Sequence, residues 1–250
     1  MYEPRLEKRK NGIPVISKRE IDALGAKIVL DFCPEAMKEP QSLDEEAFVQ
    51  YYLCKTMDFR FLSHCGLYLG MTVFDDNHRV AVYDPEKNRA EYCVFHAGTI
   101  IIDNSLMMPD RKPRYRYTVF HEGSHVILHQ RYFENLPALS DSVNPSAVLC
   151  RMVKNPFAQR PHRVWTDYDW AEWQANALAS ALLMPAPMVR LLVERSGKIA
   201  TAFDVAYCVQ ECSRIFGVSI QAAEYRLKDL GYFSGFSIYE VEAELSLFAH

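Results

Sequence analysis

The chain has 250 residues, of which 49% are hydrophobic and 24% are charged, as in an ordinary globular protein. Its net charge of −4 provides no overall basic field for nucleic acid or an anionic membrane surface. No apolar run approaches the roughly 18–20 residues that span a bilayer, and the charged N-terminus lacks the apolar core of a signal peptide. We therefore expect a cytoplasmic protein without membrane contact.

Residues 1–16 carry many charges, Gly12 and two prolines, and we interpret them as an N-terminal arm. Capping boxes at Ser17–Glu20 and Ser42–Glu45 predict two helices, the second continuing to about Lys55. The chain then becomes rich in β-branched and aromatic residues separated by turn formers, which predicts a small, mostly antiparallel sheet. Its strands are expected at residues 58–62, 66–74, 79–83, 91–95 and 99–103.

The pattern is helical from about Arg114 onward, which makes the order helices, strands, helices and favours an α+β fold. Helices are expected at about 114–132, 169–184, 187–195, 200–215 and 219–230, with Pro185 and Pro187 ending the second of these. We divide the chain into an arm (1–16), a main domain (17–195), a helix-turn-helix-like module (196–233) and a tail (234–250).

The seven cysteines do not indicate a disulfide framework, because their number is odd and their spacing is scattered. Cys208 and Cys212 have helical i,i+4 spacing and could bind a metal together. We interpret them instead as apolar packing, which is more common for such a pair.

Residues 121–125 read His-Glu-Gly-Ser-His, an HExxH motif inside the expected helix 114–132. Positions i and i+4 lie on one helix face, so His121 and His125 can share one zinc ion. Glu122 would stand beside the metal and take a proton from its bound water. Gly123 costs helix stability, so its presence indicates a close approach by another element.

His129 continues the stripe, but it lies eight residues from His121, or about 12 Å along a helix, which is too far to share an ion comfortably. We interpret it as a histidine of the second layer or of the helix end. The best third ligand is Glu172, and Asn176 lies one turn later on the same face. Asn176 could accept a hydrogen bond from a ligand histidine and fix its ring. Small residues around this pair would let the helices approach closely.

The segment around the HExxH motif and the segment around Glu172 together resemble the ImmA/IrrE-type metallo-endopeptidases. The resemblance rests on residues 115–129 and 172–185 and on the strand 99–103, and covers roughly residues 60–190. It implies a zincin-like (thermolysin-like) core over 17–195, with zinc on His121, His125 and Glu172 and with Glu122 as the general base. It further implies hydrolysis of a specific protein substrate, typically a DNA-binding repressor.

The sequence departs from the family pattern in the 47 positions that separate His125 from Glu172. Loops as long as the insert at 133–166 are usually functional or disordered. Because this one is rich in basic and aromatic residues, we expect it to control access of a protein substrate. Tyr132, His162 and Tyr168 are candidates for stabilising the oxyanion.

Two other functions stay open. The chain could be a metal-binding regulator that acts on DNA or protein through its C-terminal helices. The charges of the second helix, with Arg226 and Lys228 beside Glu224 and Asp229, cancel and make direct nucleic-acid binding unexpected. It could also be a metal-binding scaffold without activity, although every residue that the chemistry needs is present. The substrate and the oligomeric state are not indicated.

Overall fold

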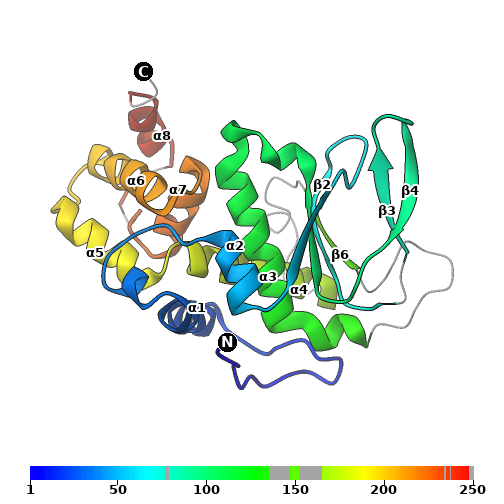
Figure 1. The fold of residues 1–250 in the computed structure, drawn as a ribbon. Helices are drawn as coiled ribbons and strands as arrows, with labels where there is room; N and C mark the ends of the chain where they lie inside the picture. Colours follow the sequence, from blue (N-terminus) through cyan, green and yellow to red (C-terminus); the bar gives the residue numbers. More distant parts are fainter. Residues whose placement is uncertain (77–78, 136–146, 152–164, 234, 237, 248–250) are drawn as a thin grey trace.

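The computed structural model describes residues 1–76, 79–135, 147–151, 165–233, 235–236 and 238–247. The fold is α+β, as predicted: helices lie on one side of a small mixed sheet, and a separate two-stranded hairpin lies on the other (Figure 1). Most of the expected insert, including His162 and the stretch 152–164, lies outside the described residues.

Four strands form the main sheet in the order β1-β5-β2-β6. These are β1 (Thr56–Arg60), β2 (Tyr68–Val73), β5 (Thr99–Asp103) and β6 (Ala147–Arg151). β1 pairs with β5 in parallel, whereas the β2–β5 and β2–β6 pairs are antiparallel. The sheet is therefore mixed, and β6 adds an edge strand from within the insert that the sequence did not predict.

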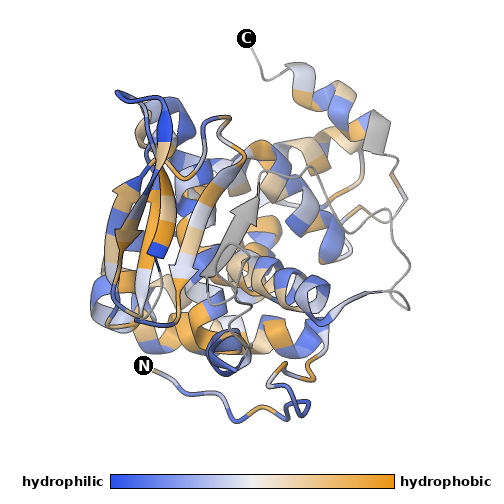
Figure 2. Cartoon of the chain, turned by 90° about the vertical axis from the view of Figure 1, so that its right-hand side faces the viewer, coloured by the Kyte–Doolittle hydropathy of each residue, from blue (hydrophilic) through white to orange (hydrophobic). Residues whose placement is uncertain are grey.

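Strand β5 is buried on both faces, which explains its unbroken run of β-branched residues. Ile100 and Ile102 pack with the helical core, while Ile101 points to the other face. There it meets the hairpin of β3 (Arg79–Asp84) and β4 (Arg89–Val94), whose Val80 and Val82 cover the outer face of the sheet. Figure 2 shows the hydrophobic residues of these strands in orange.

The long helix α3 (Lys112–Glu134) lies against the inner face of the sheet and contacts β2, β5 and β6. On its other side it packs against α4 (Asp167–Leu183), which in turn packs against α1 (Lys18–Phe32). α1 and α4 approach very closely, since a Cβ added to Gly25 would lie 2.7 Å from that of Ala181. α3 therefore lies between the sheet and α4.

One predicted helix start is wrong. Asp44, and not Ser42, is the N-cap, because its side chain accepts a hydrogen bond from the Ala47 amide. The helix that follows is also broken into a short α turn, α2 (Glu45–Ala47), and a π-helical segment, Phe48–Tyr52. The Ser17 capping box at the start of α1 is confirmed.

The C-terminal part consists of α5 (Ala186–Ser196), α6 (Ala202–Phe216), α7 (Ile220–Asp229) and α8 (Ile238–Leu247), the last of which was not predicted. Cys208 and Cys212 are buried on α6 in the main hydrophobic core, which confirms apolar packing. Arg226 of α7 is also buried, where it pairs with Asp22 at 2.6 Å and donates to the Met184 carbonyl. The charged group of Arg226 is therefore buried and is not displayed on the surface of α7.

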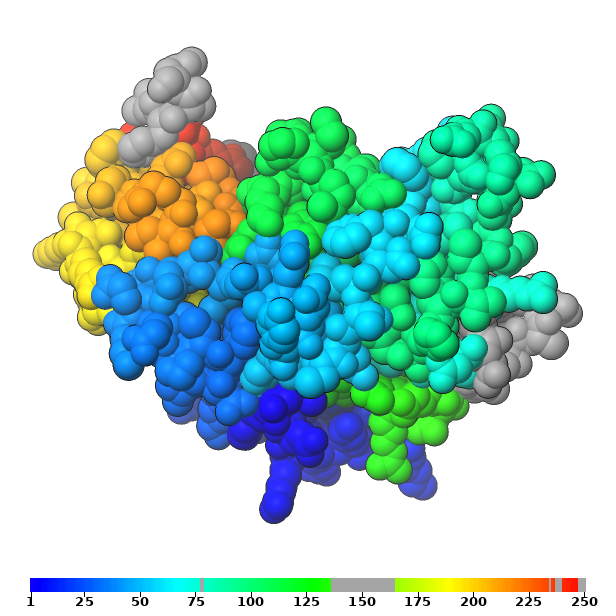
Figure 3. Space-filling model, in the orientation of Figure 1, coloured from blue at the N-terminus to red at the C-terminus, as the bar shows by residue number. Residues whose placement is uncertain are grey.

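No single described helix combines the length and hydrophobicity needed to cross a membrane. Among the described helices, α4 and α5 taken together are the one pair that passes such a test, and they are bent by 49° relative to one another. In the space-filling view the N-terminal arm, in dark blue, crosses the lower edge of the molecule (Figure 3).

Candidate metal centre

The HExxH residues lie in the middle of α3, where this helix is enclosed by the sheet and by other helices. His121 and His125 are almost completely buried, and their Nε2 atoms lie 3.0 Å apart. Gly123 has the close neighbour that its position indicated, because an added Cβ would lie 2.9 Å from the Phe48 ring. A larger residue there would push α3 away from the segment that precedes β1.

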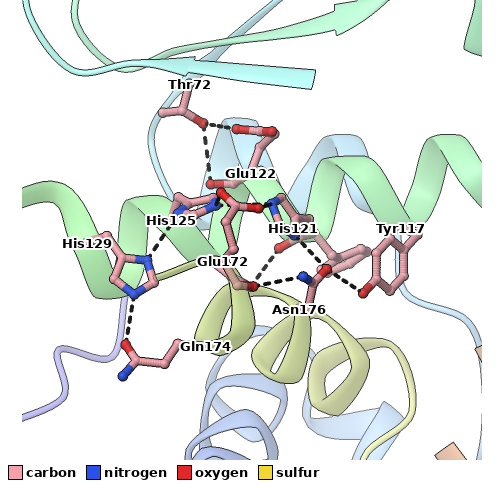
Figure 4. Close-up of polar contacts among 11 residues, drawn as sticks. Thr72, Tyr117, His121, Glu122, His125, His129, Glu172, Gln174 and Asn176 are labelled. Atoms are coloured by element: carbon pink, nitrogen blue, oxygen red, sulfur yellow. Dashed lines mark hydrogen bonds and ion pairs between the residues drawn. The ribbon is translucent and has the colours of Figure 1, made fainter. Parts of the chain in front are cut away.

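Glu172 on α4 reaches across to both histidines (Figure 4). Its carboxylate oxygens lie 3.3 Å from His125 Nε2 and 3.6 Å from His121 Nε2. Within the described residues, this is the one group of three or more potential ligands whose ligand atoms lie within 4.8 Å of one another. The three residues that the sequence selected are thus brought together from two helices.

The spacing of these three ligand groups suits a tetrahedral ion. Ligands held at 2.0–2.1 Å from zinc stand about 3.3 Å apart along the edges of a tetrahedron. The two Nε2 atoms lie 3.0 Å apart, Glu172 Oε1 lies 3.3 Å from His125 Nε2, and the other oxygen, Oε2, lies 3.6 Å from His121 Nε2, so the separations are close to that value. Two imidazole nitrogens and one carboxylate oxygen are also the donor chemistry of catalytic zinc sites, which keep a fourth position open.

The environment keeps both histidines neutral, as a metal ligand must be. Burial lowers the pKa of His121 to about 4, an effect that His125 strengthens and that Glu172 and Asn176 oppose. Burial also lowers the pKa of His125 to about 3. At neutral pH each ring therefore presents a lone pair without first having to release a proton.

Asn176 lies one turn beyond Glu172 and contacts His121. Its Oδ1 is 3.1 Å from His121 Nδ1 and accepts a hydrogen bond of 2.8 Å from the Tyr117 hydroxyl. Its amide nitrogen donates to the Glu172 carbonyl at 2.8 Å. This geometry suits a residue that orients a ligand histidine and is not itself a metal ligand.

Glu122 points in the opposite direction, towards β2 (Figure 4). The Thr72 hydroxyl donates a 2.6 Å hydrogen bond to Glu122 Oε2, while Oε1 has no hydrogen-bond partner among the described residues. Burial raises the pKa of Glu122 well above its ordinary value, and nearby Glu172 raises it further, against the lowering effect of Thr72. Gly70 makes room for this carboxylate, since an added Cβ would lie 2.8 Å from Oε1.

His129 lies beyond the ligand set, in the second layer that its spacing indicated. Its Nδ1 is 3.1 Å from His125 Nδ1, and its Nε2 is 2.9 Å from Gln174 Oε1. Tyr132 packs in a small apolar cluster with Ile13, Phe74 and Phe133, and Tyr168 lies on the first turn of α4. Neither tyrosine belongs to the group of described residues whose ligand atoms come together.

Sequence reasoning missed Thr72, Tyr117 and Gln174. Tyr117 could have been found, because it precedes His121 by one helical turn, the same spacing that relates His121 to His125. Thr72 and Gln174 gave no such signal. Their roles depend on how β2 and α4 pack against α3, which no local pattern specifies.

Residues 148–228 match the family model of the IrrE N-terminal-like domain, Peptidase_M78, which confirms the resemblance seen in the sequence and indicates a peptidase. No curated protein matches the chain. The matched segment contains Glu172 and Asn176 but begins after the HExxH motif. It also extends through α6 and most of α7, beyond the range over which we noted the resemblance.

Proposed function

We propose that this chain, which matches the IrrE N-terminal-like peptidase domain over residues 148–228, is a zinc-dependent endopeptidase with a zincin-like core. One observation carries the proposal. The ligand atoms of His121, His125 and Glu172 lie within 4.8 Å of one another, and a buried carboxylate, Glu122, follows the first ligand on the same helix. A zinc ion bound there would lower the pKa of a coordinated water and polarise the carbonyl of the scissile bond.

In this proposal Glu122 is the general base. Its raised pKa makes it a better proton acceptor than an ordinary carboxylate, and Thr72 fixes one oxygen while the other has no hydrogen-bond partner among the described residues. Glu122 would then pass the proton to the leaving amine. Asn176 would hold His121 with its Nε2 towards the metal.

The proposed substrate is a specific protein, for which a DNA-binding repressor is the candidate that the family resemblance suggests. The long connection between the ligand helices would contribute to its recognition. Deleting residues 152–164 should sharply reduce cleavage of the protein partner, while zinc content and cleavage of a small unstructured peptide persist. Unchanged partner cleavage would remove the insert from recognition, and an unfolded variant would assign it a structural role.

The metal assignment is tested by elemental analysis of the purified chain, which should contain about one zinc per molecule. His125→Ala should lose that metal, whereas Gln130→Ala, an exposed change on the same helix, should keep it. Peptidase activity is tested by mass-spectrometric detection of new termini in a mixture of unstructured peptides. An unchanged zinc content in His125→Ala would contradict the ligand set.

A further inference from the structure

A chain of hydrogen-bonding groups runs from the N-terminal arm into the candidate metal centre. The Gln174 amide nitrogen donates to the Pro14 carbonyl at 2.9 Å. Gln174 Oε1 faces His129 Nε2 at 2.9 Å, and His129 Nδ1 faces His125 Nδ1 at 3.1 Å. Gln174 and His129 are both buried, so each contact is shielded from water.

The Pro14 carbonyl sets the direction of every bond in this chain. A backbone carbonyl can only accept, so the amide nitrogen of Gln174 must face it and Oε1 must face His129. That oxygen also only accepts, so His129 carries its proton on Nε2. A neutral imidazole has a single N–H, and once that proton is on Nε2 the Nδ1 of His129 is an acceptor.

The last contact in this chain joins His129 to His125, a candidate metal ligand. Because His129 Nδ1 accepts, His125 Nδ1 must donate, and the lone pair of His125 is then on Nε2. This is the atom that lies 3.0 Å from His121 Nε2 and 3.3 Å from Glu172. We propose that His129 and Gln174 are positioning residues that fix the tautomer of His125, and that the turn at residues 8–15 belongs to the metal centre through the Pro14 carbonyl.

The turn is anchored firmly enough for this role. Ile13 is completely buried beside Phe133, and an added Cβ at Gly12, whose φ is +96°, would lie 3.1 Å from the Tyr132 backbone nitrogen. Arg9 pairs with Asp167 at 2.9 Å, and Asn11 donates to the same carboxylate at 2.6 Å. The arm is thus fixed to the end of α3 and to the start of α4.

The inference rests on the proposed function only in taking His125 as a ligand, and its test needs no peptidase assay. Long-range ¹H–¹⁵N correlation spectra of the metal-free full chain report which nitrogen of each histidine carries the proton. We expect His129 as the Nε2–H tautomer and His125 as the Nδ1–H tautomer. A proton on His129 Nδ1 or on His125 Nε2 would overturn the proposal, whether or not the chain cleaves peptides.

Gln174→Met removes both hydrogen bonds with little change in volume. We expect the zinc affinity, measured by competition with a chromogenic chelator, to fall by about 10–100-fold, the range typical for loss of an outer partner. The His129 and His125 signals should also indicate mixed tautomers. Gln130→Met, the same substitution at an exposed site on α3, should change neither quantity. Wild-type affinity and tautomers in Gln174→Met would refute the role, and the wild-type spectra decide the question if this variant does not fold.

Discussion

Asn176 contacts His121, and Gln174 is linked to His125 through His129. Each amide donates to a backbone carbonyl, that of Glu172 or of Pro14, and so turns its own oxygen towards a histidine. For His121 the contact is direct, with Tyr117 donating to the same oxygen. Both ligand rings are therefore oriented by groups whose hydrogen-bonding direction is fixed by the main chain.

Glu122→Gln is the clearest test of the proposed chemistry. The amide fills the same space and can still contact Thr72, but it cannot accept a proton, so activity should fall by at least about 100-fold while zinc content stays unchanged. Peptide cleavage and elemental analysis measure the two effects. Glu134→Gln, an exposed change on the same helix, should behave as wild type. Full activity would exclude Glu122 as the base, and loss of zinc would make it a ligand.

Asn176→Ala should weaken zinc binding by about 10–100-fold without changing the number of zinc ions bound. The variant removes the acceptor for His121 Nδ1, so the ring loses its fixed orientation. Tyr117→Phe should have a smaller effect, because the contact between Asn176 and His121 remains. Chelator competition measures both variants, and Ser180→Ala on the same helix serves as control. Equal affinities in Asn176→Ala and wild type would contradict a positioning role.

At the level of secondary structure, local patterns predicted most elements of this chain. The strand pattern placed β5 at its observed residues, and the helix pattern placed α3 within two residues of each end. The π-helical segment before β1 was not predictable, because its apolar residues fit an ordinary helix equally well. Strand β6 was missed because it exists only by pairing with β2, which is distant in sequence.

In the candidate site, too, the residues set by local spacing were predictable and those set by long-range packing were not. His121 and His125 are four positions apart on a helix, as are Glu172 and Asn176, so both pairs could be selected from the sequence alone. The group that faces Glu122 could not, because Thr72 comes from a strand 50 positions earlier. Metal chemistry is encoded locally, whereas the orientation of the base depends on how the sheet packs on α3.

Arg226 provides a prediction about α7. Its guanidinium is buried and joins α7 to Asp22 of α1 and to the carbonyl at the end of α4. Arg226→Ala leaves a buried cavity and breaks this link, which should lower the free energy of unfolding by about 3–5 kcal/mol. Lys228→Ala, two positions away and exposed, should change it by less than about 0.5 kcal/mol. Urea denaturation measures both, and equal stabilities would mean that Arg226 does not hold the helices together.

Over the whole molecule, the packing of the C-terminal helices bears on the predicted module at 196–233. Val205, Val209 and Phe216 of α6 belong to the same hydrophobic core as Val119 and Phe120 of α3. Arg116 of α3 pairs with Glu45 and also donates to the Phe216 carbonyl, where Gly217 ends α6 in the left-handed conformation. The boundary at 196 stays a prediction, but these contacts lead us to expect that the helices fold together with the rest.

A chain ending at residue 195 tests that expectation. Truncation would expose core residues of α5, which packs against α6, such as Val189, and each fully buried side chain of this kind contributes about 1.5–3 kcal/mol. We expect residues 1–195 to lose the cooperative thermal transition of the full chain, followed by circular dichroism, and to bind less than one zinc. Supplying residues 196–250 as a separate fragment should restore both properties, because the missing surface is returned without the covalent link. A truncated chain that melts cooperatively with one bound zinc would instead establish 196–233 as an independent module.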